Sequence, residues 1–90
     1  MYSITASVPF IPGESEQAAN AWRNDLEKIV AQNGGLIQIR SHGSRPEFQK
    51  ITRLTANLTG LNVSGLVIKQ VVDELKMKYP LAQISYSEGD

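Results

Sequence analysis

The sequence predicts one α+β domain in which an antiparallel sheet carries two helices on one of its faces. Four segments alternate apolar and polar residues with the period of two that is typical of strands. Two further segments repeat apolar residues at the spacing of amphipathic helices. A chain of 90 residues is long enough to bury one hydrophobic core and too short for two. We therefore expect residues 1–90 to form a single domain.

The sequence predicts the first strand and the first helix most clearly. From Tyr2 to Phe10, apolar side chains alternate with serine, threonine and proline, which predicts a strand with one covered face. A helix is expected from about residue 15 to 33, with Trp22 on its buried stripe and Arg23 and Glu27 facing away. The glycines that follow Asn33 tolerate positive φ and predict its end.

Three more elements complete the pattern. Strands are expected at 36–41 and 51–58, separated by a polar, turn-rich loop. A second helix begins after a cap at Asn62 or Ser64 and stops before Pro80. The alternation then resumes from Ala82 and predicts a fourth strand.

This order of strand, helix, strand, strand, helix, strand resembles the ferredoxin-like βαββαβ split sandwich. The resemblance covers the whole chain. It implies a four-stranded antiparallel sheet with the first and third strands at its centre and both helices on one face. Because it rests on the order of elements, it implies a fold and no particular function.

The polar side of every strand would then form an uncovered sheet face. A solvated sheet face explains hydroxyl and amide side chains well, and a polar docking surface is the alternative interpretation. The side chains expected on this face are Ser3, Thr5, Ser7, Gln38, Arg40, Arg53, Thr55, Asn57, Thr59, Gln83 and Ser85.

One basic segment, residues 40–53, holds four of the nine basic residues together with the single histidine, His42. A basic arm with Phe48 available to stack would suit contact with phosphate and bases. RNA-recognition modules of this fold, however, stack bases on aromatic residues of the first and third strands. The corresponding outward positions here include Thr5 and Asn57. Nucleic-acid binding through Arg40, Arg45, Lys50 and Arg53 is therefore the second hypothesis.

Catalytic signatures are missing from the sequence. The chain has no cysteine, which excludes a thiolate nucleophile or a zinc–cysteine site. His42 is flanked by serines, but neighbouring residues in a loop rarely reach the geometry of a nucleophile and its base, so a small enzyme or ligand-binding regulator using His42 is the third hypothesis. The paired carboxylates, including Asp25 with Glu27, are interpreted as helix-terminus charges or solvated helix positions. We expect no metal and no cofactor.

Charge and hydropathy limit the partners and the location. Nine basic and nine acidic residues cancel, so the chain has no general attraction to nucleic acid or anionic lipid. The strand pattern begins at Tyr2, which leaves no room for a signal peptide, and no apolar run is long enough to span a membrane. We therefore expect a cytoplasmic protein that does not contact membranes.

These observations favour a non-enzymatic protein-interaction module, such as an inhibitor, an adaptor or an assembly subunit. It would bind another protein through the open sheet face, an edge strand or the 42–50 loop, and the same strand edges are compatible with a homo-oligomer. The residues expected to contact the partner are Arg40, His42, Arg45, Phe48, Lys50, Arg53, Thr55 and Asn57.

Overall fold

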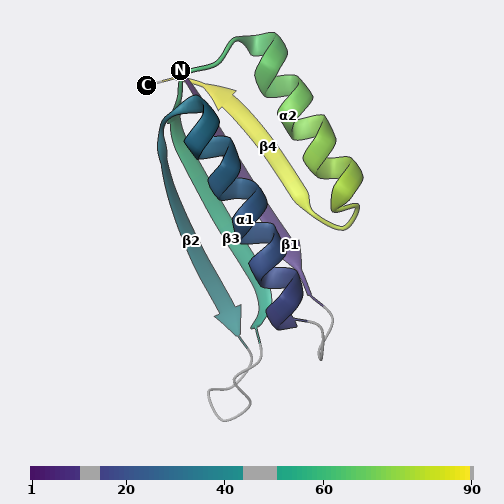
Figure 1. Ribbon diagram of the computed structural model, residues 1–90. Coiled ribbons are helices and arrows are strands. Elements are labelled where there is room, and N and C mark those ends of the chain that lie inside the picture. The colour runs from purple at the N-terminus through teal and green to yellow at the C-terminus, as the bar shows by residue number, and fades with distance from the viewer. Residues whose placement is uncertain (11–14, 44–50, 90) are drawn as a thin grey trace.

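A computed structural model describes residues 1–10, 15–43 and 51–89 of the chain (Figure 1). It contains four strands and two helices in the predicted order. In sequence these are β1 (Tyr2–Pro9), α1 (Ser15–Asn33), β2 (Leu36–Gly43), β3 (Ile51–Leu61), α2 (Gly65–Lys78) and β4 (Gln83–Glu88).

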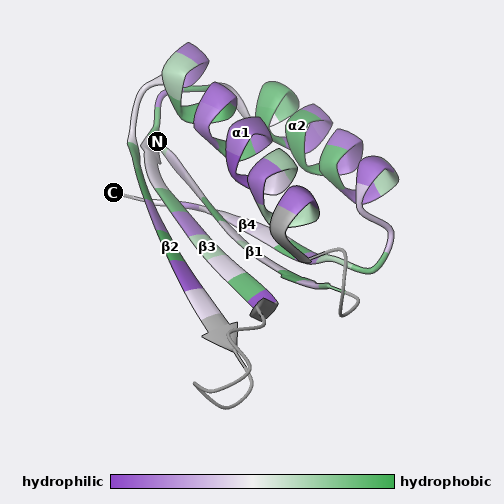
Figure 2. Ribbon diagram, turned by 60° about the horizontal axis from the view of Figure 1, so that its bottom comes forward, coloured by the Kyte–Doolittle hydropathy of each residue, from purple (hydrophilic) through white to green (hydrophobic). Residues whose placement is uncertain are grey.

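The four strands form one antiparallel sheet in the order β2-β3-β1-β4. β1 and β3 are therefore central, and β2 and β4 are the edges. Both helices lie on the same face of the sheet, and the opposite face is uncovered (Figure 2). The predicted α+β ferredoxin-like fold is confirmed in its element order, its sheet and its single helical layer.

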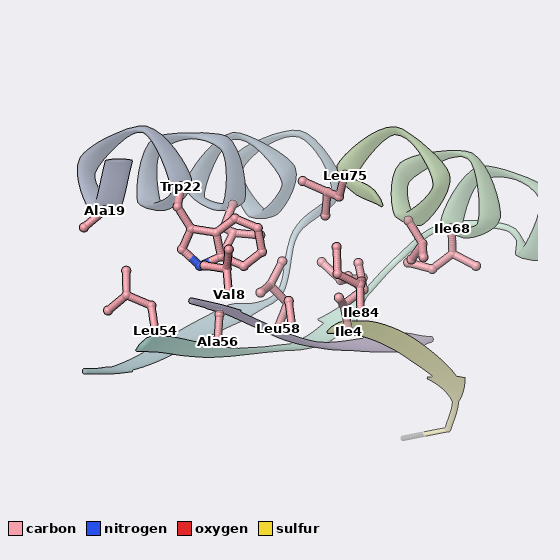
Figure 3. Close-up of a cluster of buried hydrophobic side chains, with 14 residues drawn as sticks. Ile4, Val8, Ala19, Trp22, Leu54, Ala56, Leu58, Ile68, Leu75 and Ile84 are labelled. Atoms are coloured by element: carbon pink, nitrogen blue, oxygen red, sulfur yellow. The ribbon is translucent and has the colours of Figure 1, made fainter. Parts of the chain in front are cut away.

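The hydrophobic core fills the space between the helices and the sheet (Figure 3). Trp22 of α1 is fully buried, as its place on the apolar stripe predicts. Its ring meets that of Tyr79 edge to face, with centroids 4.7 Å apart. The other buried side chains are Ile4, Ala6, Val8, Ala19, Leu26, Leu54, Ala56, Leu58, Leu61, Ile68, Val72, Leu75 and Ile84.

β3 continues three residues beyond its predicted end at Leu58. Gly60 takes a positive φ of 70°, and the β1–β3 register shifts between Tyr2 and Ile4. A glycine in the left-handed region lets one strand carry an extra residue and resume pairing. The bulge therefore allows Leu61 to pair with Tyr2 and to enter the core.

The helix ends follow the sequence signals. Gly34 and Gly35 adopt positive φ values of 75° and 103° immediately after α1. Of the two predicted caps of α2, Ser64 is the one used, because its hydroxyl accepts the N–H of Val67 at 3.3 Å. Tyr79 closes α2 by donating its N–H to the Leu75 carbonyl.

The two ends of the described chain meet at one end of the sheet (Figure 1). The N–H of Gly89 donates to the carbonyl of Met1 at 2.9 Å. Among the residues that the structure describes, no helix is long and apolar enough to cross a membrane.

Candidate interaction site at the β2 edge

The uncovered face of the sheet is polar and partly bonded within itself. Ser7 Oγ accepts hydrogen bonds from Arg53 Nη1 at 2.7 Å and from Thr55 Oγ1 at 3.4 Å. One row along, Thr5 Oγ1 donates to Asn57 Oδ1 at 3.3 Å. These bonds agree with the predicted strand parity. They also hold the Arg53 guanidinium against β1, which leaves it less free to reach a phosphate.

Four of the eight predicted partner-binding residues lie together on this face. Arg40 pairs across the β2–β3 ladder with Thr55, and Gln38 pairs with Asn57 in the next row. Arg53 lies one row further along β3. The structure therefore gathers Arg40, Arg53, Thr55 and Asn57 into one polar area beside the β2 edge.

The remaining four predicted residues belong to the 42–50 loop or its start. The backbone of His42 continues β2 and pairs with Arg53. The side chain of His42 lies outside the described residues, as do Arg45, Phe48 and Lys50. The loop itself stays a prediction.

One hydrogen bond shows toward which neighbouring strand the backbone groups of each residue point. The bond from Gly89 to Met1 makes these residues a hydrogen-bonded pair that continues the β1–β4 register. Hydrogen-bonded and non-bonded pairs alternate along an antiparallel ladder. The odd-numbered residues of β1 therefore direct their backbone N–H and C=O groups toward β4, and the even-numbered ones direct theirs toward β3.

The same alternation continues through β3 to the edge strand β2. Even-numbered residues of β1 pair with even-numbered residues of β3, as Ile4 does with Leu58. The backbone groups of these β3 residues therefore bond to β1, and those of the odd-numbered β3 residues bond to β2. Those residues pair with even-numbered positions of β2, as Thr55 does with Arg40. The backbone groups that point outward from the free edge of β2 are those of Ile37, Ile39 and Ser41.

The helical layer does not fully cover this edge. Ile37 and Ile39 pack against the core but are only half-buried, whereas Ile84 on the other edge strand is 8% exposed. Figure 1 shows the reason: α1 runs above the middle of the sheet, and β2 lies along its outer side. Apolar side chains and free backbone groups therefore occur together along β2.

The outer flank of α1 completes the surface. The residues of α1 that line the groove toward α2 include Asp25, Ile29 and Gln32. With 3.6 residues per turn, Arg23, Glu27 and Val30 lie on the opposite flank, on the β2 side. Arg23 and Val30 are half-buried and Glu27 is exposed. The Nε of Arg23 is buried and has no hydrogen-bond partner within the described part of the chain. We define the β2 edge surface as Arg23, Glu27, Val30, Ile37, Ile39 and Ser41.

The other edge strand, β4, is more closely covered by a helix. By the same alternation, β4 directs the backbone groups of Ile84, Tyr86 and Glu88 outward. α2 packs on β4 and on β1, and it covers Ile84. Tyr86 is 42% exposed and lies beside Tyr2, with ring centroids 6.2 Å apart. On the helical side of β4, this ring is the exposed apolar side chain among the described residues.

A polar cluster joins the two helices on the far side of α1. Asp25 accepts a hydrogen bond from the Tyr79 hydroxyl at 2.5 Å and pairs with Lys78 Nζ at 2.8 Å. Burial by itself raises the pKa of Asp25, but the hydrogen bonds from Lys78 and Tyr79 and the nearby positive charges outweigh it and hold this pKa below its usual value. Burial, and then the Asp25 carboxylate, raise the pKa of Tyr79. The cluster is explained as a structural link between the helices.

Two hollows beside this cluster are small. One of ≈ 200 Å³ lies among Val8, Phe10, Tyr79 and Leu81, and one of ≈ 240 Å³ lies between α1 and α2. Pockets that enclose a small organic ligand usually measure about 300–1,000 Å³. Their size does not favour either hollow over the β2 edge surface as the functional site.

Comparison with known proteins shows the fold. No protein-family model matches the chain, and no curated protein sequence matches it. The chain is similar in structure to the C-terminal domain of the MgtC protein from Mycobacterium tuberculosis, with a TM-score of 0.59, 17% identity, and coverage of 98% of this chain and 85% of that one. A formyltetrahydrofolate deformylase from Pseudomonas putida gives a TM-score of 0.56 at 9% identity, covering 98% of this chain and 28% of that one. The de novo designed protein Ferredog-Diesel gives 0.52 at 14% identity, covering 97% and 83%. At these identities the similarities establish the ferredoxin-like architecture and carry no function with them.

Sequence reasoning missed part of this surface and the helix-linking cluster. Arg23 was expected to face solvent, but its side chain is half-buried. It follows Trp22 in the helix and so lies at the border of the apolar stripe, and not on the side of α1 opposite to that stripe. Asp25 was interpreted as a solvated carboxylate, but it is bonded to Lys78 and Tyr79. Arg23 and Val30 are seven residues apart, about two helical turns. This spacing could have indicated that they lie on the same flank of α1.

Proposed function

We propose that this protein is a non-enzymatic interaction module that binds an extended segment of a partner protein along the free edge of β2. The observation that supports this most strongly is the coincidence of outward backbone groups and half-buried isoleucines at Ile37 and Ile39. An extended segment bonded to β2 would satisfy the backbone groups through a new ladder. Alternate side chains of that segment would cover the isoleucines on the helical side.

The open face would contribute specificity. Arg40 and Gln38 lie on β2 next to Thr55 and Asn57, so a strand added at this edge would bring its other side chains beside them. Acidic or amide side chains suit these positions, because a guanidinium and an amide can both donate to them. Arg53 would contribute less, since Ser7 already accepts its hydrogen bond.

The experiment compares proline substitutions on the two edges. Proline is tolerated on an edge strand where its nitrogen faces outward, and it removes the donor that an added strand needs. Ser41 and Glu88 are exposed residues whose N–H groups point outward from β2 and β4. Ser41→Pro should abolish binding to a partner purified with the wild-type chain, and the matched control Glu88→Pro should retain it.

Mapping by NMR shows where the purified partner binds. Titration should shift and protect the amides of Ile37, Ile39 and Ser41 before those of β4. A partner that binds Ser41→Pro as tightly as the wild type would contradict the proposal. A partner that proves to be RNA or DNA would favour the nucleic-acid hypothesis instead.

A further inference from the structure

We infer that the segment that binds this edge belongs to a second copy of the chain, so that two sheets join through antiparallel β2 strands into one. This inference names the partner of the proposed function and rests on it. It is carried by three features of the β2 edge surface: its register, its apolar side chains and its charges.

The outward backbone groups allow a two-fold axis. In an antiparallel pair centred on Ile39, each Ile39 faces its counterpart, and Ile37 faces Ser41 of the second copy. All three residues then form hydrogen-bonded pairs, because all three direct their N–H and C=O groups outward. The register irregularity between His42 and Gly43 ends the regular ladder just beyond this stretch. The central register therefore uses the whole regular part of the edge.

Side chains on the open face favour the same register. With Ile39 at the centre, Gln38 of one copy lies opposite Arg40 of the other, and an amide oxygen can accept from a guanidinium. A shift that centres the pair on Arg40 would instead place two guanidinium groups opposite each other, which is unfavourable. Arg40 thus acts against one alternative pairing.

The helical side is complementary in charge. A two-fold axis at Ile39 sets the two α1 helices antiparallel above the seam, with their outer flanks facing. Arg23 and Glu27 lie one turn apart on that flank, near the middle of α1. An axis that passes between them brings each Arg23 beside Glu27 of the second copy, twice by symmetry. This contact places a carboxylate beside the half-buried Arg23 side chain. Val30, Ile37 and Ile39 would be covered beneath it.

The position of the helices favours β2 over β4 for such a symmetric pair. α1 packs mainly on the central strand β3, whereas α2 packs mainly on the edge strand β4. Two sheets joined through β4 would bring two α2 helices toward the same space above the seam, and packed helices need about 8–10 Å between their axes. Joining through β2 leaves the space above the seam free, because α1 lies mainly over β3.

Sedimentation equilibrium over a range of protein concentrations tests the inference. The wild-type chain and Glu88→Pro should form dimers as concentration rises, and Ser41→Pro should stay monomeric. Arg23→Glu and Glu27→Arg should each raise the dimer dissociation constant by about tenfold or more. The double variant should restore it, and Lys28→Glu, on another flank of α1, should change it little.

Amide hydrogen exchange of the wild-type chain gives a test that needs no variant. Protection at Ile37, Ile39 and Ser41 should rise with concentration, while Ile84, Tyr86 and Glu88 should not change. A chain that is monomeric at all concentrations, or a dimer that survives Ser41→Pro, would overturn the inference. If the monomer still binds a different protein and Ser41→Pro abolishes that binding, the proposed function stands and only the second copy is rejected.

Discussion

At the scale of single residues, Asp25 is the side chain whose role is best defined by its contacts. Its side chain is 22% exposed, and its carboxylate joins α1 to the end of α2 through Lys78 and Tyr79. Hydrogen bonds to a charged acceptor are stronger than those between neutral groups. Because the folded state lowers the pKa of Asp25, the ionised form stabilises the fold.

The free energy of unfolding of Asp25→Asn should therefore be lower than that of the wild type by about 1–2 kcal/mol at neutral pH. The folded pKa lies below the ordinary 3.8, so the stabilisation is present above that value and is lost as the pH falls through the folded pKa. The difference between the two proteins should thus shrink as the pH falls below the ordinary 3.8. Urea titrations at several pH values measure it.

Asp73→Asn removes an exposed carboxylate from α2 and is the matched control for loss of one negative charge. A gap between wild type and Asp25→Asn that stays constant down to the lowest pH would show that the carboxylate is not ionised preferentially in the folded state.

At the scale of elements, the turn from α1 into β2 depends on two adjacent glycines that differ in their surroundings. Both have positive φ, which costs other residues about 1–2 kcal/mol. A side chain at Gly34 would meet open space, whereas one at Gly35 would press against the backbone carbonyl of Thr59. Gly35 is thus required both for its φ and for the close approach of the turn to β3.

Gly34→Ala should lower the free energy of unfolding by about 1 kcal/mol, and Gly35→Ala by about 3 kcal/mol or more. Chemical denaturation of both variants measures the difference, and Gly34→Ala serves as the internal control because it shares the positive φ. Equal losses would mean that the Thr59 carbonyl moves aside at little cost.

At the scale of the whole molecule, the side chains of both helices and all four strands contribute to one core. Trp22, the only tryptophan, lies within it and contacts Tyr79, the residue that ends α2. Its fluorescence therefore reports on the packing of both helices.

Unfolding of the 90-residue chain should be a single cooperative transition. Trp22 fluorescence and far-ultraviolet circular dichroism should give the same midpoint in urea, because the indole is released only when the layers separate. Transitions at clearly different denaturant concentrations would show that the chain does not unfold as one domain.

Most of this architecture could be predicted from periodicity. The alternation from Tyr2 onward and the stripe around Trp22 determine which faces are covered, because burial favours one side of each element. The third strand was predicted three residues short, at Leu58. Glycine is typical of turns, whereas Gly60 forms a bulge within the ladder.

The candidate site and the polar face beside it could be predicted only in part. Arg40, Thr55 and Asn57 follow from strand parity alone, and the structure places them together. The half-buried state of Ile37 and Ile39 could not be predicted, because it depends on where α1 lies above the sheet. Such a position is set by packing between distant segments and leaves no periodic signal in β2 itself.

The hydrogen bond from Gly89 to Met1 also has a practical consequence for construction of variants. Because the two ends are adjacent, a short linker could close the chain into a ring, and new ends could be opened elsewhere. The whole unit could likewise be inserted into a surface turn of a carrier protein without stretching either junction. Both junctions would lie at the end of the sheet where β1 begins and β4 finishes, so the long outer side of β2 would stay accessible in the fusion.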